Sequence, residues 1–202
     1  MYWGEPDASV SFCEQKYKIT PYIAEYYNTM SAFSYMIVGI LFYFTKLRYI
    51  SNVLLLMGLG TMALHCTLRY YGQWMDEISM IILSFYIIKY LRNDLFKKQT
   101  RNIYLYGIIS GYFLFHKFFI YFFLIFAGMQ IYIYKLAQLK RKKNKIIENI
   151  LIKAYTISLI IATICWTLDQ IACNYVRYFQ LHAVWHVGTA LAMLFGFTAI
   201  II

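Results

Sequence analysis

The chain has 202 residues and a formal net charge of +10, yet 61% of its residues are hydrophobic and only 14% are charged. Soluble domains carry about 25% charged residues, so this composition excludes a soluble globular protein. It predicts an all-α protein that crosses a membrane several times, built as one domain over residues 1–202. The positive charge does not indicate nucleic-acid binding, because the basic residues flank apolar stretches and form no separate basic domain.

Residues 1–27 are polar and aromatic and contain both prolines of the chain, so we expect them outside the membrane. Seven apolar stretches follow, each near the ~20 residues that a helix needs to cross a bilayer. A single helix over 102–136 would be about 50 Å long, too long for a ~30 Å hydrocarbon core, so a turn is expected at His116 and Lys117. The expected spans are 28–45, 52–68, 77–95, 102–116, 118–136, 150–170 and 181–202.

The lysines and arginines are divided unevenly between the two sides of this arrangement. Five lie on the side of the N-terminus and fourteen on the opposite side, which includes the basic run at 140–145. The positive-inside rule places the fourteen in the cytosol. The N-terminus is then lumenal or extracellular, and seven spans leave the C-terminus cytosolic.

Two histidines, His182 and His186, lie four residues apart at the start of the last apolar stretch. In a helix this spacing places both imidazoles on one face. His65 lies near the lumenal end of the second span, at the same expected depth. Three histidines and a water form a catalytic zinc arrangement. The alternative is that they are unrelated core histidines, hydrogen-bonded to neighbouring helices.

Two further polar residues lie at the same expected depth. Thr61 precedes His65 by four residues and shares its helix face, and Asp76 begins the third span. Three roles stay open for the Asp76 carboxylate: it can cap a helix, act as a general base, or orient a metal ligand.

These residues belong to longer blocks that resemble the alkaline ceramidases, in a membrane-hydrolase superfamily that also includes the adiponectin and progestin receptors. The blocks are YWG at 2–4, CE at 13–14, TPYIAEYYNT at 20–29, HCTLRY at 65–70, QWMDEISM at 73–80, WTLD at 166–169 and HAVWH at 182–186. The resemblance implies a seven-helix hydrolase of the endoplasmic reticulum or Golgi membrane. It would cleave ceramide to a sphingoid base and a fatty acid, on the lumenal side.

The resemblance implies zinc on His65, His182 and His186, with catalytic support from Asp76. The family has a serine four residues before the first histidine, and here Thr61 keeps the hydroxyl, which would support the developing oxyanion. Two other functions stay open. The chain could hydrolyse or remodel another lipid with zinc, or it could bind lipid as a receptor does, with little turnover.

The family also has a calcium site in its N-terminal segment, and the resemblance places Glu14 and Glu25 among its ligands. Two positions depart from the family pattern, because Ser11 replaces an aspartate and Lys16 replaces an asparagine. Losing a carboxylate and adding an ammonium weaken a site for a hard cation. We therefore expect calcium to bind weakly or not at all, with Lys16 partly replacing the ion. The alternative for both glutamates is an ordinary solvated face.

Two cysteines, Cys13 and Cys173, fall in segments that are expected to be lumenal, where the compartment is oxidising. The family pairs the cysteines at these positions, so the resemblance implies a disulfide between them. Such a bridge would tie the N-terminal segment to the last two spans, beside the histidines.

Overall fold

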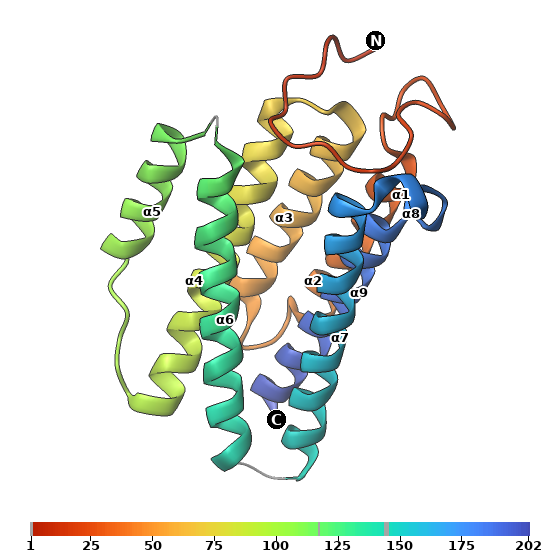
Figure 1. Cartoon of the computed structure of the whole chain (residues 1–202). Helices are drawn as coiled ribbons and strands as arrows, with labels where there is room; N and C mark the ends of the chain where they lie inside the picture. Colours follow the sequence, from red (N-terminus) through yellow and green to blue (C-terminus); the bar gives the residue numbers. More distant parts are fainter. Residues whose placement is uncertain (1, 117, 144–145) are drawn as a thin grey trace.

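The computed structural model describes residues 2–116, 118–143 and 146–202 (Figure 1). Over these residues it is a bundle of helices without a strand, which confirms the predicted all-α class. The two termini lie at opposite ends of the bundle. The helices are α1 (Tyr26–Ser31), α2 (Phe33–Phe42), α3 (Arg48–Thr67), α4 (Tyr70–Phe96), α5 (Ile103–Leu114), α6 (Phe119–Lys143), α7 (Ile146–Ile171), α8 (Cys173–Val176), the 3-10 helix η1 (Arg177–Phe179) and α9 (Leu181–Ile201).

Within the described part of the chain, four helices are long and apolar enough, by length and composition, to cross a membrane: α3, the 119–141 part of α6, α7 and α9. The other expected spans correspond to shorter or more polar helices. α2 has ten residues and α5 has twelve, while α4 has 27 residues but includes charged side chains such as Lys89 and Arg92. The count of seven spans and the orientation of the termini stay predictions.

The stretch 102–136 forms two helices. α5 ends at Leu114 and α6 begins at Phe119, with Phe118 N donating to Phe115 O (2.8 Å) in the connection. Lys117, which we placed in this turn, lies outside the described residues. α6 runs to Lys143, beyond the expected end at 136, because lysine, arginine, leucine and glutamine are good helix formers. The last residue of the basic run, Lys145, is also outside the described part.

α3 and α4 approach each other closely because two glycines face the neighbouring backbone. A Cβ atom at Gly60 would lie 2.7 Å from Asp76 N, and one at Gly72 would lie 2.5 Å from Leu64 N. A larger residue at either position would force the helices apart. α4 begins at Tyr70, earlier than the expected start at 77, and its second turn is therefore pressed against α3.

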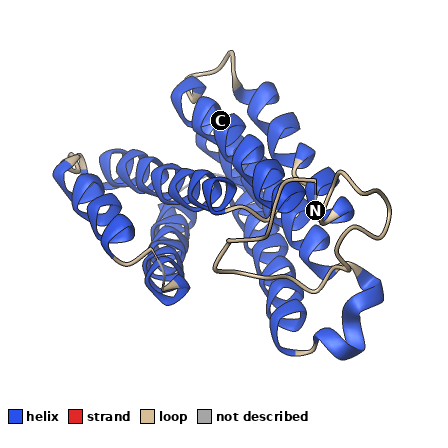
Figure 2. Cartoon of the chain, turned by 90° about the horizontal axis from the view of Figure 1, so that it is seen from above, coloured by secondary structure: helices blue, strands red, loops and turns tan. Residues whose placement is uncertain are grey.

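The N-terminal segment, residues 2–25, is a long loop that lies over one end of the bundle (Figure 2). We call this end, where α3 passes into α4 and where α8 lies, the site end. A disulfide joins Cys13 to Cys173, with 5.4 Å between the Cα atoms. Close to α1, Glu25 N donates to His65 O (2.9 Å). These contacts, together with those of Asp7 and Ala8 to Leu68 O, fasten the segment to the bundle along its length.

Candidate functional site

Three histidines converge inside the bundle at its site end. His65 lies in the last turns of α3, and His182 and His186 lie in the first turns of α9. All three are buried. Ring centroids are 5.0 Å apart between α3 and each α9 histidine and 4.6 Å apart between the two on α9. One ligand nitrogen from each ring lies within 4.8 Å of the others, so the group could hold a metal ion.

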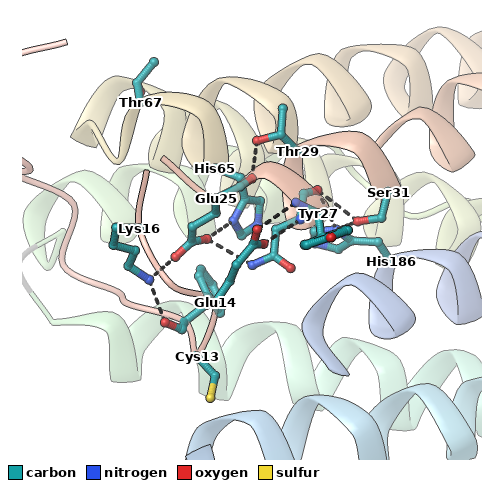
Figure 3. A network of polar contacts seen from close by, with 12 residues as sticks. Cys13, Glu14, Lys16, Glu25, Tyr27, Thr29, Ser31, His65, Thr67 and His186 are labelled. Carbon is teal, nitrogen blue, oxygen red and sulfur yellow. Dashed lines mark hydrogen bonds and ion pairs between the residues drawn. The ribbon is translucent and has the colours of Figure 1, made fainter. Parts of the chain in front are cut away.

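Glu25 makes a contact with this cluster that the sequence did not indicate. His65 Nδ1 lies 2.5 Å from Glu25 Oε2 (Figure 3). Burial by itself raises the pKa of Glu25, but the hydrogen bond to His65 and the neighbouring charge of Lys16 outweigh it and lower the pKa. An ionised carboxylate only accepts hydrogen bonds, so Nδ1 carries the proton. The other nitrogen of His65, Nε2, then has a free lone pair for a metal.

Residues of α1 orient His186 in the same way. His186 Nδ1 lies 2.7 Å from Ser31 Oγ and 3.2 Å from the carbonyl oxygen of Asn28. A carbonyl oxygen only accepts, so Nδ1 is the donor, and Nε2 is again left for a ligand. α1 is short, but its position beside α9 fixes the ring of a candidate metal ligand.

His182 differs from the other two histidines. Its Nδ1 is buried and has no hydrogen-bond partner among the described residues. The ring of Phe12 covers it, with centroids 3.8 Å apart. A buried polar nitrogen without a partner is unfavourable unless it binds a metal ion or another group that replaces the missing hydrogen bond. Three buried imidazoles, one of them unpartnered, fit the donor set that zinc prefers.

Thr61 and Asp76 meet across the close contact of α3 and α4. Thr61 Oγ1 donates to Asp76 Oδ1 at 2.6 Å and also lies 2.9 Å from Met57 O. Asp76 is in the second turn of α4, and the residue before that helix is Arg69. The carboxylate therefore does not cap the helix, which removes one of the three roles left open for it.

Glu14 is buried together with Glu25, so the solvated-face alternative for these two acids is wrong. The two carboxylate oxygens of Glu14 accept the backbone N–H groups of Tyr27 (2.8 Å) and Asn28 (2.9 Å), at the start of α1. Burial raises the pKa of Glu14, and these two hydrogen bonds oppose the rise. Glu14 thus holds the N-terminal segment against the helix that orients His186.

Another acid in α4, Glu77, is buried, and the sequence did not single it out. Tyr112 of α5 donates to Glu77 Oε2 (2.6 Å), and Gln73 donates to Oε1 (3.0 Å). Gln73 also donates to Ser9 Oγ (2.7 Å), so the network joins α4, α5 and the N-terminal segment. In the sequence, the only indication of a role for Glu77 was its position next to Asp76.

A cavity of about 680 Å³ extends from the histidines into the bundle. Thr61, Asp76, His182 and His186 are part of its lining. Most of the remaining wall comes from α6 and α7, and most of the side chains that these two helices contribute are apolar. An apolar cavity with a few polar groups at one end suits a ligand with a hydrocarbon body and a polar group.

These features define a class: an all-helical protein with helices of membrane-crossing length and a buried three-histidine cluster on the wall of an apolar cavity. The chain matches the family model described as Ceramidase over residues 4–202. It is 27% identical to an alkaline ceramidase of Arabidopsis thaliana over 92% of this chain and 80% of that protein. It is also 27% identical to alkaline ceramidase 1 of Mus musculus, over 94% and 77% of the two chains. The chain belongs to the Ceramidase family.

Proposed function

We propose that this protein is a zinc-dependent hydrolase that cleaves the amide bond of ceramide and releases a sphingoid base and a fatty acid. One observation carries the proposal: three buried histidines could hold one metal ion, and two of them, His182 and His186, line an apolar cavity together with Asp76. Membership of the Ceramidase family and the names of the relatives support the substrate class.

His65, His182 and His186 would hold the ion. Zinc bound there would supply a Lewis acid for the amide carbonyl and a water of lowered pKa. The protein's own part is to keep the rings in place: Glu25 fixes the ring of His65 and Ser31 that of His186. A group that hydrogen-bonds to the second nitrogen of a metal-binding histidine raises the basicity of that histidine and sets its tautomer.

Asp76 is the proposed proton carrier. Its Oδ1 accepts the hydrogen bond from Thr61, which leaves Oδ2 to take a proton from the attacking water and to deliver one to the leaving amine. A threonine hydroxyl has a single proton, and here both acceptors near it are protein atoms, Asp76 Oδ1 and Met57 O. We therefore assign Thr61 to positioning Asp76, in place of the oxyanion contact expected from the sequence.

The two hydrocarbon chains of ceramide would enter from the bilayer. α6 and α7 form most of the apolar cavity wall, and few of their residues are buried inside the protein. A lipid can reach the histidines between such helices without leaving the membrane. The uneven distribution of lysine and arginine supports a site end that faces the lumen of the endoplasmic reticulum or Golgi.

The test is an assay of the purified full chain in detergent. Ceramide is compared with a fatty-acid ester and with a simple N-acyl amine of the same chain length, and bound zinc is measured by mass spectrometry. We expect about one zinc per chain and release of fatty acid from ceramide above the other two. Preference for the ester would indicate another lipid hydrolase. Lipid binding without turnover by the zinc-loaded protein would indicate a receptor-like member, and either result would overturn the proposal.

A further inference from the structure

Lys16 reaches from the N-terminal segment toward the histidine cluster. Its Nζ forms an ion pair with Glu25 Oε1 and donates to the carbonyl oxygen of Phe12 at 2.6 Å. The side chain of Lys16 is 29% exposed, whereas that of Glu25 is 0% exposed. Figure 3 shows the lysine side chain pointing at the carboxylate of Glu25. The ammonium is thus held between two oxygen atoms, one from Phe12 and one from Glu25 at the start of α1.

The carboxylate of Glu25 has a partner on each oxygen. Oε1 pairs with Lys16, and Oε2 lies 2.5 Å from His65 Nδ1 and accepts from Asn28 Nδ2 (3.1 Å). The same carboxylate therefore contacts the lysine on one side and a candidate metal ligand on the other. A buried carboxylate without a positive partner is strongly unfavourable, so the position of Glu25 depends on these charges.

The oxygen atoms around the ammonium are of the kind that calcium prefers. Phe12 contributes a backbone carbonyl and Glu25 a carboxylate. The second buried carboxylate, Glu14, accepts from Asn28 N, and the side chain of the same asparagine donates to Glu25. Two carboxylates and one ammonium leave a formal charge of −1 facing any additional cation. Affinity for a divalent ion falls with the charge of its ligands and with the loss of an open position.

We propose that the Lys16 ammonium is a built-in cation that takes the place of a bound divalent ion at Glu25. It holds residues 12–16 against the bundle and, through Glu25, fixes the ring of His65. Lys16 is then a positioning residue for the metal centre, and the chain needs no calcium for assembly of this site. The inference deepens the proposed function at His65, but its main test measures calcium binding and does not depend on catalysis.

Removing Lys16 should leave a folded protein, because other contacts hold the same segment. The disulfide joins Cys13 to Cys173, Cys13 N donates to Asp169 Oδ2 (3.1 Å), and Glu14 accepts two backbone N–H groups of α1. The variant Lys16→Asn replaces the ammonium by an amide oxygen, which is a calcium ligand. Adding Ser11→Asp supplies a further carboxylate from the same segment.

The experiment uses the full chain in detergent and compares the unmodified protein with Lys16→Asn, with Lys16→Asn/Ser11→Asp and with Lys16→Arg. Lys18→Asn is the matched control, because it removes the same charge two residues further on, at an exposed position. Bound calcium is measured by equilibrium dialysis with radioactive calcium from nanomolar to millimolar. Thermal unfolding is followed in the same buffers, since an ion that binds only the folded chain raises the midpoint.

We expect no calcium-dependent shift for the unmodified chain, Lys16→Arg or Lys18→Asn. Lys16→Asn should unfold at a lower temperature without calcium, and millimolar calcium should raise its midpoint by about 5 °C. The double variant should bind calcium more tightly, by about tenfold, because it adds a carboxylate. Zinc retained after gel filtration should fall in Lys16→Asn and return when calcium is added.

Two results would overturn the inference. Micromolar calcium binding by the unmodified chain would show that the ammonium does not occupy the cation position. A Lys16→Asn variant as stable as the unmodified chain and indifferent to calcium would show that the ammonium does not hold Glu25. If the calcium responses appear as expected but no variant hydrolyses ceramide, the proposed function fails and this inference stands.

Discussion

Two sides of the bundle are built from similarly apolar helices but are held together differently. The tied side consists of residues 12–31 with α3 and α9, where hydrogen bonds link segments far apart in the sequence. The open side consists of α6 and α7. In α3, 56% of the most apolar window is buried inside the protein, against 17% in α6 and 11% in α7.

This difference shows how one helical bundle can fix side-chain positions on one side and leave room for a lipid on the other. On the tied side, Glu25 holds the ring of His65, and Ser31 and the carbonyl oxygen of Asn28 hold the ring of His186, in each case through Nδ1. On the open side, apolar side chains face outward or line the cavity, and lipid tails are as apolar as those side chains. Burial of apolar surface therefore does not favour contact between α6 and α7 over contact with lipid, and a lipid substrate can share the space between them.

The largest expected effect is on the tied side, at the histidines. His65→Ala or His186→Ala should remove bound zinc and reduce ceramide hydrolysis to background, because two ligands hold zinc far more weakly than three. Zinc content and fatty-acid release are measured on purified protein. His116→Ala is the control, since this histidine lies in the α5–α6 connection. Full zinc content and normal turnover in both variants would exclude the histidine cluster as the metal centre.

The next effect concerns the contact between Thr61 and Asp76. Asp76→Asn should lower kcat by about 10²–10⁴-fold with zinc retained, because it removes a proton carrier and leaves the ligands in place. Thr61→Ser should keep activity, and Thr61→Val should lose part of it, because only serine retains the hydroxyl that donates to Asp76. Equal activity of Thr61→Val and the unmodified chain would contradict the positioning role.

A third effect concerns stability on the tied side. Cys13→Ser or Cys173→Ser should lower the unfolding midpoint, since loss of a native disulfide costs about 2–5 kcal/mol in small secreted domains. Cys66→Ser is the control, because Cys66 is a free cysteine. Mass spectrometry of the unreduced protein checks the bridge directly. Free thiols at both positions would show that the disulfide does not form. Equal midpoints for all three variants would show that it does not stabilise the protein.

The smallest effect is expected on the open side. Ala127 of α6 lines the cavity, whereas a Cβ at the neighbouring Gly128 would have nothing within 4 Å. Ala127→Phe should raise KM for long-chain ceramide several-fold and change kcat little, because it narrows the space for hydrocarbon. Gly128→Phe should leave both constants unchanged. Identical chain-length profiles for the two variants would show that the substrate does not lie against α6.

Several features of the protein follow from local sequence. The apolar stretches predict helices, and the break between α5 and α6 follows from the length of a single helix over 102–136. The spacing of His182 and His186 places them on one helix face, and the depth of His65 brings it to the same end. These predictions succeed because helix periodicity and span length are properties of neighbouring residues.

Other features are set only by contacts between distant parts of the chain. Glu25 lies 40 residues from His65, and Ser31 lies 155 residues from His186. Hydropathy also does not distinguish α3 from α7, although one is mostly buried and the other mostly faces outward.

Residues 2–25 contain no regular helix, so no periodicity indicates which way their side chains point. Tertiary packing therefore decides where the Lys16 ammonium lies. It also decides that the Thr61 hydroxyl donates to Asp76 and which residues orient the histidines. The physical reason is that a buried charge or hydroxyl must find its partner in three dimensions, wherever that partner lies in the sequence.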